Sequence, residues 1–180
     1  MGVLVGCVGT GKTTVFNLIT NRKHETSDGG KSVTRTVFSS PSGFGEKFSI
    51  MDTPGTLADE DKLAHAINLR MALIERPLSR IFLFIKFERH GAMVKNLEEQ
   101  LFFLQEWKFL ITVIVTHWDK EVFPANIAEY EMVKKKLMDN NDIVNSFIFI
   151  GIKANPISAC NAIYQSLCIY LPTQLEISDQ

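Results

Sequence analysis

The chain has 180 residues, of which 46% are hydrophobic and 22% are charged, and its formal net charge is -1. This length suits one domain with a buried core, and the near-neutral charge gives no electrostatic basis for binding nucleic acid or an anionic membrane surface. No apolar run reaches the roughly 18 residues that a membrane span needs, and no secretory signal is evident at the start. Three cysteines, an odd number, favour a reducing compartment, so we expect a cytoplasmic protein.

The first predicted element is a buried strand over Val3–Val5, followed by Gly6-Cys7-Val8-Gly9-Thr10-Gly11-Lys12-Thr13. This segment matches G-x-x-x-x-G-K-[ST], the phosphate-binding loop of nucleoside-triphosphate enzymes, in which glycines let backbone N–H groups approach the phosphates. Lys12 is expected at the β- and γ-phosphates, and the Thr13 hydroxyl is expected to ligate Mg²⁺. The helix predicted over Thr13–Thr20 points its positive end at the same anion. The residues expected to bind nucleotide here are Gly9, Thr10, Gly11, Lys12, Thr13 and Thr14. By itself the loop leaves ATPases, kinases and GTPases open.

A hairpin is predicted next. The polar, glycine-containing stretch Asn21–Lys31 indicates a loop, and we expect its histidine, His24, to be exposed. The alternating, β-branched stretch Ser32–Phe38 predicts a strand, residues 41–45 a turn, and Glu46–Asp52 a second strand. Together these segments predict a hairpin at one edge of a sheet.

The second strand of that hairpin runs directly into Asp52-Thr53-Pro54-Gly55. An aspartate at a strand's carboxyl end can hold Mg²⁺ through water, as in the second Walker motif. Gly55 can donate its backbone N–H to a γ-phosphate and serve as a hinge. The alternative is a capping aspartate before an ordinary Pro-Gly turn.

Helices and strands alternate through the rest of the chain. Apolar runs predict strands over Ser79–Lys86, Phe109–Val115 and Ser146–Ile152, and helical spacing predicts helices over residues 58–75, Ala92–Trp107, Ile127–Met138 and Ile157–Tyr170. This order predicts a three-layer α/β/α P-loop NTPase domain with a mostly parallel sheet and one antiparallel edge strand, over residues 1–172, with a tail at 173–180. In such folds ligands bind beyond the carboxyl ends of the strands, where the motifs converge.

Thr116-His117-Trp118-Asp119 is similar to the guanine-reading [NT]-[KR]-x-D motif of GTPases. The Asp119 carboxylate can accept hydrogen bonds from the N1–H and the exocyclic amine of guanine, donors that adenine lacks. His117 replaces the usual lysine, and an imidazole can stack but carries no fixed charge at pH 7. The alternative is a strand-end turn in which Asp119 caps a helix.

These motifs resemble the immunity-associated, avirulence-induced (GIMAP) branch of GTPases, close to the chloroplast outer-envelope Toc receptors and more distantly to septins. The resemblance covers about residues 3–170 and rests on Gly6–Thr14 with Asn17, Ser32–Thr36, Asp52–Gly55 and Thr116–Asp119. It implies a G domain that binds GTP or GDP with Mg²⁺, and that Thr34 is the switch threonine, with Thr36 as the alternative. It further implies that a fifth motif, within Gly151–Asn155, contacts guanine through Lys153 and Ala154.

The position that carries a water-orienting glutamine in many small GTPases is Thr56 here, so intrinsic hydrolysis is expected to be slow. The resemblance implies that hydrolysis is accelerated by the GTP-dependent pairing of two G domains, in which Arg89 would reach the partner's site. The alternative for Arg89 is an ordinary surface arginine. The residues expected to take part in hydrolysis are Lys12, Thr34, Gly55 and Arg89, and the expected Mg²⁺ ligands are Thr13, Thr34 and Asp52.

Four alternative functions are compatible with this pattern. The first is a GTP-hydrolysing switch that forms homodimers or homo-oligomers. The others are a GTP-binding scaffold with negligible turnover, an ATP-using P-loop protein, and a degenerate protein that binds no nucleotide. The C-terminal extension of many relatives is not part of this sequence, so we expect a bare G domain, either soluble or part of a longer protein. Peripheral membrane association would then depend on other segments or on partners.

Overall fold

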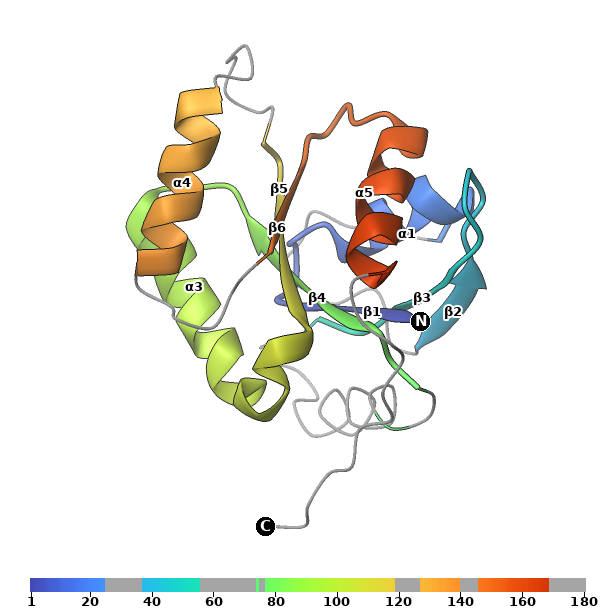
Figure 1. Ribbon diagram of the computed structural model, residues 1–180, viewed down its shortest axis with the longest axis horizontal. Helices are drawn as coiled ribbons and strands as arrows, with labels where there is room; N and C mark the ends of the chain where they lie inside the picture. Colours follow the sequence, from blue (N-terminus) through green and yellow to red (C-terminus); the bar gives the residue numbers. More distant parts are fainter. Residues whose placement is uncertain (25–36, 56–73, 75–76, 119–126, 140–145, 169–180) are drawn as a thin grey trace.

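The computed structural model describes residues 1–24, 37–55, 74, 77–118, 127–139 and 146–168. Strands and helices alternate along the chain around one central sheet (Figure 1). The strands are β1 (Gly2–Gly6), β2 (Phe38–Pro41), β3 (Ser49–Asp52), β4 (Arg80–Lys86), β5 (Ile111–Thr116) and β6 (Phe147–Ile150). The helices are α1 (Lys12–Thr20), α3 (His90–Phe103), the 3₁₀ segment η1 (Gln105–Leu110), α4 (Ile127–Asp139) and α5 (Pro156–Cys168).

The sheet has six strands in the order β2-β3-β1-β4-β5-β6. Every neighbouring pair is parallel except β2 with β3, which form an antiparallel hairpin at one edge. The predicted fold class is therefore confirmed. Because β1, β3, β4, β5 and β6 run in the same direction, their carboxyl ends, and the segments that follow them, lie along one rim of the sheet.

Helices cover both faces of the sheet, with α1 and α5 on one side and α3 and α4 on the other (Figure 1). Side chains alternate along β1 between the two cores: Val3 and Val5 pack on the α3–α4 side, and Leu4 packs on the α1–α5 side. The strands between are buried on both faces, which is why β4 and β5 read as unbroken apolar runs. Among the described residues, no helix is both long and apolar enough to cross a bilayer.

Several predicted boundaries differ from the structure: β3 begins at Ser49 rather than Glu46, β6 spans Phe147–Ile150 rather than Ser146–Ile152, and three other differences have a clear cause. Pro41 lies in β2 opposite Ser49 rather than in the turn, and an edge strand tolerates a proline because one of its sides needs no donor. The predicted strand Phe109–Val115 begins instead at Ile111, because its first two residues belong to η1. The helix predicted over Ala92–Trp107 spans His90–Phe103.

Other expected segments cannot be compared in full. The helix over residues 58–75 lies outside the described residues apart from Ile74, which is helical. Of the strand predicted over Ser32–Phe38, only its last two residues are described, and Phe38 begins β2. The expected tail at 173–180 also lies outside the described residues.

Candidate nucleotide-binding site

The glycine-rich loop joins the end of β1 to the start of α1. Gly9 and Gly11 have φ angles of 77° and 84°, in the left-handed region that favours glycine. Gly11 is the N-cap of α1, and its carbonyl accepts the first helical hydrogen bond from the backbone N–H of Val15 at 2.9 Å. The loop is thus a tight turn at a helix N-terminus, the arrangement that binds phosphate groups.

Lys12 lies buried beneath the loop. Its Nζ donates to the carbonyl oxygens of Gly6 at 2.9 Å and Cys7 at 2.8 Å. Burial lowers the pKa of Lys12 from its ordinary value near 10.5 to about 8, while the negative charge of Asp52 acts in the opposite direction. The loop therefore already orients the ammonium group, and a phosphate chain would supply the anionic partner that raises its pKa again.

This arrangement predicts that triphosphate binding weakens at alkaline pH. In the free protein Lys12 loses its proton above about pH 8, whereas a bound phosphate chain restores a higher pKa. GTP affinity should therefore fall as pH rises above this value, by up to about tenfold per pH unit, and binding should take up about one proton. Calorimetry at alkaline pH, in buffers of different ionisation enthalpy, measures that uptake; zero uptake would contradict the assignment of Lys12.

The proposed metal ligands meet at the start of α1 and the end of β3. The Thr13 hydroxyl donates to Asp52 Oδ2 at 2.7 Å, and Asp52 is fully buried. Its second oxygen, Oδ1, accepts no hydrogen bond from the part of the chain that the structure describes. Burial raises the pKa of Asp52, and the Thr13 hydrogen bond and the charge of Lys12 oppose that rise. An orphaned carboxylate oxygen beside a threonine hydroxyl fits a hard cation such as Mg²⁺, which prefers oxygen ligands.

The segment after β3 packs directly against the phosphate loop. A Cβ at Gly55 would lie 2.9 Å from the backbone N of Val8 and 2.6 Å from its Cγ2, so only glycine fits this approach. The Thr53 hydroxyl donates to the carbonyl of Leu4 at 2.6 Å and is completely buried. Sequence reasoning missed Thr53, although its position after a strand-end aspartate was the available signal. Gly55 is thus held close to the loop, where its N–H could reach a γ-phosphate.

The start of the guanine motif also contacts the phosphate loop. The Thr116 hydroxyl, at the end of β5, donates to the carbonyl of Thr10 at 2.8 Å. A Cβ at Gly11 would lie 3.6 Å from the His117 ring, and His117 has a φ of 59°. The chain therefore turns sharply over the loop after β5. Asp119 itself lies outside the described residues, because the described stretch that contains β5 ends at Trp118.

Trp118, the variable position of that motif, is a packing residue that sequence reasoning missed. Its ring makes edge-on contacts with Phe87 at 4.8 Å and Phe149 at 4.6 Å between centroids. These two residues follow β4 and lie in β6, so the tryptophan joins three neighbouring strand ends. An aromatic residue at this point of the sequence was the only signal.

The structure describes some of the other predicted site residues and not the rest. Lys153 and Ala154 follow β6, which is parallel to β5, so they leave the sheet at the same rim as Thr116. The Ala154 backbone N–H donates to Gly151 at 3.2 Å, and its side chain packs against the α1–α5 core. Thr14 lies in the first turn of α1. Thr34, Thr36 and Thr56 lie outside the described residues.

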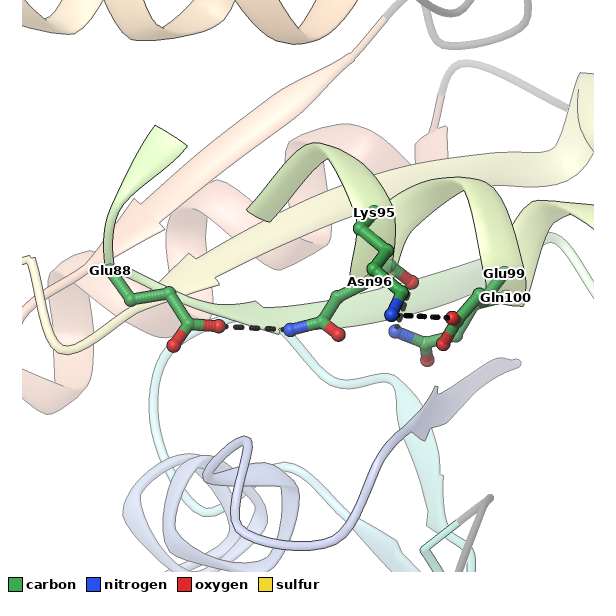
Figure 2. A network of polar contacts seen from close by, with 5 residues as sticks. All are labelled: Glu88, Lys95, Asn96, Glu99 and Gln100. Atoms are coloured by element: carbon green, nitrogen blue, oxygen red, sulfur yellow. Dashed lines mark hydrogen bonds and ion pairs between the residues drawn. The ribbon is translucent and has the colours of Figure 1, made fainter. Parts of the chain in front are cut away.

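Arg89 is exposed and caps the N-terminus of α3, just beyond the carboxyl end of β4. Its carbonyl accepts hydrogen bonds from the backbone N–H groups of Ala92 and Met93. Figure 2 shows how the preceding residue is held: Asn96 Nδ2 donates to Glu88 Oε1 at 2.9 Å, and Gln100 Nε2 donates to the Asn96 carbonyl at 3.1 Å. Arg89 thus follows an anchored residue on the rim that carries the phosphate loop.

One expectation about histidine is wrong. His24 is half-buried rather than exposed, because its ring packs between Phe16 of α1 and Phe38 of β2. A polar stretch gave no sign of this, since the contacts depend on how His24 and the first residue of β2 pack against α1.

Residues 2–117 match the model of a family described as 50S ribosome-binding GTPase. The chain belongs to this GTPase family. No curated protein matches the GTPase in sequence. The match covers the phosphate loop, Asp52, Gly55 and the first two residues of the guanine motif.

Solved structures show the same fold. NFeoB from S. thermophilus bound to mGMPPNP has 17% identity and a TM-score of 0.63, over 92% of this chain and 61% of that chain. Era in complex with MgGDPNP and a 16S ribosomal RNA segment has 14% identity and a TM-score of 0.74, over 99% and 58%. The elongation factor SelB from Methanococcus maripaludis with GppNHp has 17% identity and a TM-score of 0.61, over 94% and 34%. The GTPase therefore spans less than two thirds of the length of each.

Proposed function

We propose that this GTPase domain binds GTP with Mg²⁺ and hydrolyses it slowly to GDP and phosphate, acting as a switch. The observation that carries the proposal is the 2.7 Å contact between Thr13 Oγ1 and Asp52 Oδ2, beside the buried ammonium group of Lys12. These groups come from two different elements and meet directly under the phosphate loop. Their convergence favours a triphosphate bound together with a cation over a diphosphate bound without one.

In this proposal, each group has a separate task. The loop amides and Lys12 hold the β- and γ-phosphates, and Gly55 offers its N–H to the γ-phosphate. Thr13, Asp52 through water, and Thr34 would hold Mg²⁺, which when bound neutralises charge on the β- and γ-phosphate oxygens. Asp119 would read the guanine edge, and Lys153 and Ala154, which follow the neighbouring strand β6, would contact the same base. The position of a water-orienting glutamine is Thr56, whose hydroxyl is too short for that task, so slow turnover follows.

We further propose that two copies pair across their nucleotide faces when GTP is bound. The exposure of Arg89 on the site's rim supports this, as does the Glu88–Asn96 hydrogen bond that holds the residue beside it. The immunity-associated resemblance, which rests on Ser32–Thr36 and the Thr-His pair of the guanine motif, favours the same arrangement. A trans-acting arginine can raise the rate of GTP hydrolysis by about 10³–10⁵.

This proposal predicts that hydrolysis per molecule rises with protein concentration, and that Arg89→Ala removes only that rise. GTP affinity should stay unchanged, because in this proposal Arg89 acts on the nucleotide of the partner copy and not on its own. Turnover measured across a range of protein concentrations, for the natural protein and for Arg89→Ala, tests this. Lys95→Ala is a matched control, since Lys95 is an exposed cation on the same helix, 3.8 Å from Glu99. Equal rates for all three proteins at high concentration would contradict a trans-acting arginine.

The second candidate is a GTP-binding scaffold whose output is oligomerisation, with negligible turnover. The threonine at position 56 is the observation that favours it. Under this alternative, assembly would follow GTP binding, and no phosphate would be released at any protein concentration. For either function we propose a cytoplasmic location.

A further inference from the structure

We propose that His24 is a positioning residue for the magnesium site, together with Asn17 and Phe38. This inference rests on the proposed function, because it assigns a role toward the Mg²⁺ that Thr13 and Asp52 would hold. It concerns residues that lie outside the phosphate loop, outside Asp52–Gly55 and outside Thr116–Asp119. We call Asn17, His24 and Phe38 the His24 clamp.

The clamp begins with a reciprocal pair of hydrogen bonds. Asn17 Nδ2 donates to the His24 carbonyl at 2.7 Å, and the His24 backbone N–H donates to Asn17 Oδ1 at 2.9 Å. Asn17 lies on α1, one turn beyond Thr13. Its amide therefore satisfies both main-chain polar groups of His24 and fixes that residue against the helix.

The His24 ring then joins two elements. Its centroid lies 5.4 Å from that of Phe16 on α1, and 4.4 Å from that of Phe38, with an interplanar angle of 32° to the latter. Aromatic pairs at these separations are stabilising beyond their buried area. The imidazole is thus a spacer between α1 and the first residue of β2.

Phe38 is also the residue directly opposite Asp52 in the antiparallel ladder. A shift in the position of Phe38 would therefore also shift the β2–β3 pair, in which Asp52 is the proposed magnesium ligand. The clamp links the helix that carries Thr13 to the strand that carries Asp52.

A second contact fixes the other end of the hairpin. The Gly43 backbone N–H donates to the Ile19 carbonyl at 2.8 Å, and a Cβ at Gly43 would lie 2.8 Å from the Thr20 carbonyl oxygen. The hairpin is thus attached to α1 at its turn and again at the start of β2. These two contacts fix the orientation of the hairpin relative to α1. Without the His24 contact, the hairpin could rotate about the remaining contact at its turn.

The expected consequence is a change in Mg²⁺ affinity. Thr13 Oγ1 and Asp52 Oδ2 are 2.7 Å apart, and a metal site tolerates little error in the spacing of its ligands. Partners that orient metal ligands affect metal affinity by about 10- to 100-fold. We therefore expect His24→Leu, which keeps bulk but removes the planar ring, to raise the half-saturating Mg²⁺ concentration about 10-fold. His24→Phe, which keeps a ring in the stack, should restore it.

The test is the release rate of fluorescent GDP, measured over a series of Mg²⁺ concentrations and in EDTA. The clamp predicts that His24→Leu and Asn17→Ala shift the Mg²⁺ dependence while release in EDTA stays as in the natural protein. Lys23→Ala, an exposed neighbour, serves as control and should leave both unchanged. A merely structural role would instead accelerate release in EDTA, or destabilise His24→Leu without any shift in Mg²⁺ dependence.

The outcomes separate this inference from the proposed function. If the natural protein holds GDP in a Mg²⁺-dependent manner and His24→Leu behaves identically, the clamp is overturned and the proposed function stands. If the natural protein binds no GDP under any condition, both are overturned. If His24→Phe behaves like His24→Leu, the stacked ring is not the positioning element, and the inference also fails.

Discussion

Replacing Lys12 by methionine is expected to lower GTP affinity about 100-fold or more. Lys12 is buried and directed by the Gly6 and Cys7 carbonyls to the phosphate loop, and hydrogen bonds to charged groups contribute about 1.5–3 kcal/mol each. Two such bonds to the β- and γ-phosphates correspond to a loss of at least about 3 kcal/mol, or more than a hundredfold. Titration of the nucleotide-free protein with fluorescent GTP and GDP measures the loss.

The methionine variant keeps the aliphatic volume of Lys12, so the fold should survive. The substitution also removes a buried ammonium group. Burial lowers the pKa of Lys12 to about 8, so the variant avoids the cost of desolvating that charge. A thermal unfolding midpoint close to that of the natural protein would confirm this. Lys95→Met is the matched control, because that lysine is 75% exposed and lies on α3. Unchanged GTP affinity in a folded Lys12→Met protein would refute the phosphate-loop assignment.

The second large effect is expected for Asp119→Asn. Guanine presents an N1–H and an amine to the carboxylate, whereas xanthine presents a carbonyl oxygen in place of the amine, which an amide N–H can meet. A site built around such pairs rejects the wrong partner by up to about 10⁴-fold. We therefore expect GTP affinity to fall steeply and XTP affinity to rise. The position follows His117 and Trp118, whose turn begins over the phosphate loop.

Competition of GTP and XTP for the Asp119→Asn protein checks this prediction. Asp139→Asn is a suitable control, since that exposed aspartate ends α4 and carries no proposed role. If Asp119→Asn kept its preference for GTP, the guanine contact would have to come from another group.

Much of this fold was predictable because its signals are local. The strand, glycine turn and helix from Gly2 to Thr20 follow from a motif whose chemistry demands that order. The unbroken apolar runs of β4 and β5 predicted strands covered on both faces, and α1, α3, α4 and α5 cover them. The convergence of Thr13 with Asp52 followed from the rule that parallel strands end at one rim.

The errors arose where different structures share one pattern. The helix was predicted to continue to Trp107, but α3 ends at Phe103. The apolar pattern continues because Leu104, the N-cap of η1, and Trp107 within it keep an i, i+3 spacing, which the three residues per turn of a 3₁₀ helix place on one side. Trp107 itself has φ −112° and ψ 17°, outside the helical region. No local pattern distinguishes these two cases.

Contacts between distant residues were the part that sequence could not supply. The burial of His24 between Phe16 and Phe38 depends on how the hairpin docks on α1. The approach of Gly55 to Val8, and the hydrogen bond from Thr116 to the loop, are equally products of packing. The motifs named the residues of the site, but only the packed structure shows which of the described ones touch.

The measurement that bears most directly on the central claim is a competition of GTP, GDP, ATP and XTP for the nucleotide-free natural protein, with and without Mg²⁺. The proposal predicts that GTP and GDP compete strongly, that Mg²⁺ strengthens both, and that ATP and XTP compete poorly. ATP competing as well as GTP, or no competition from any of the four, would contradict it.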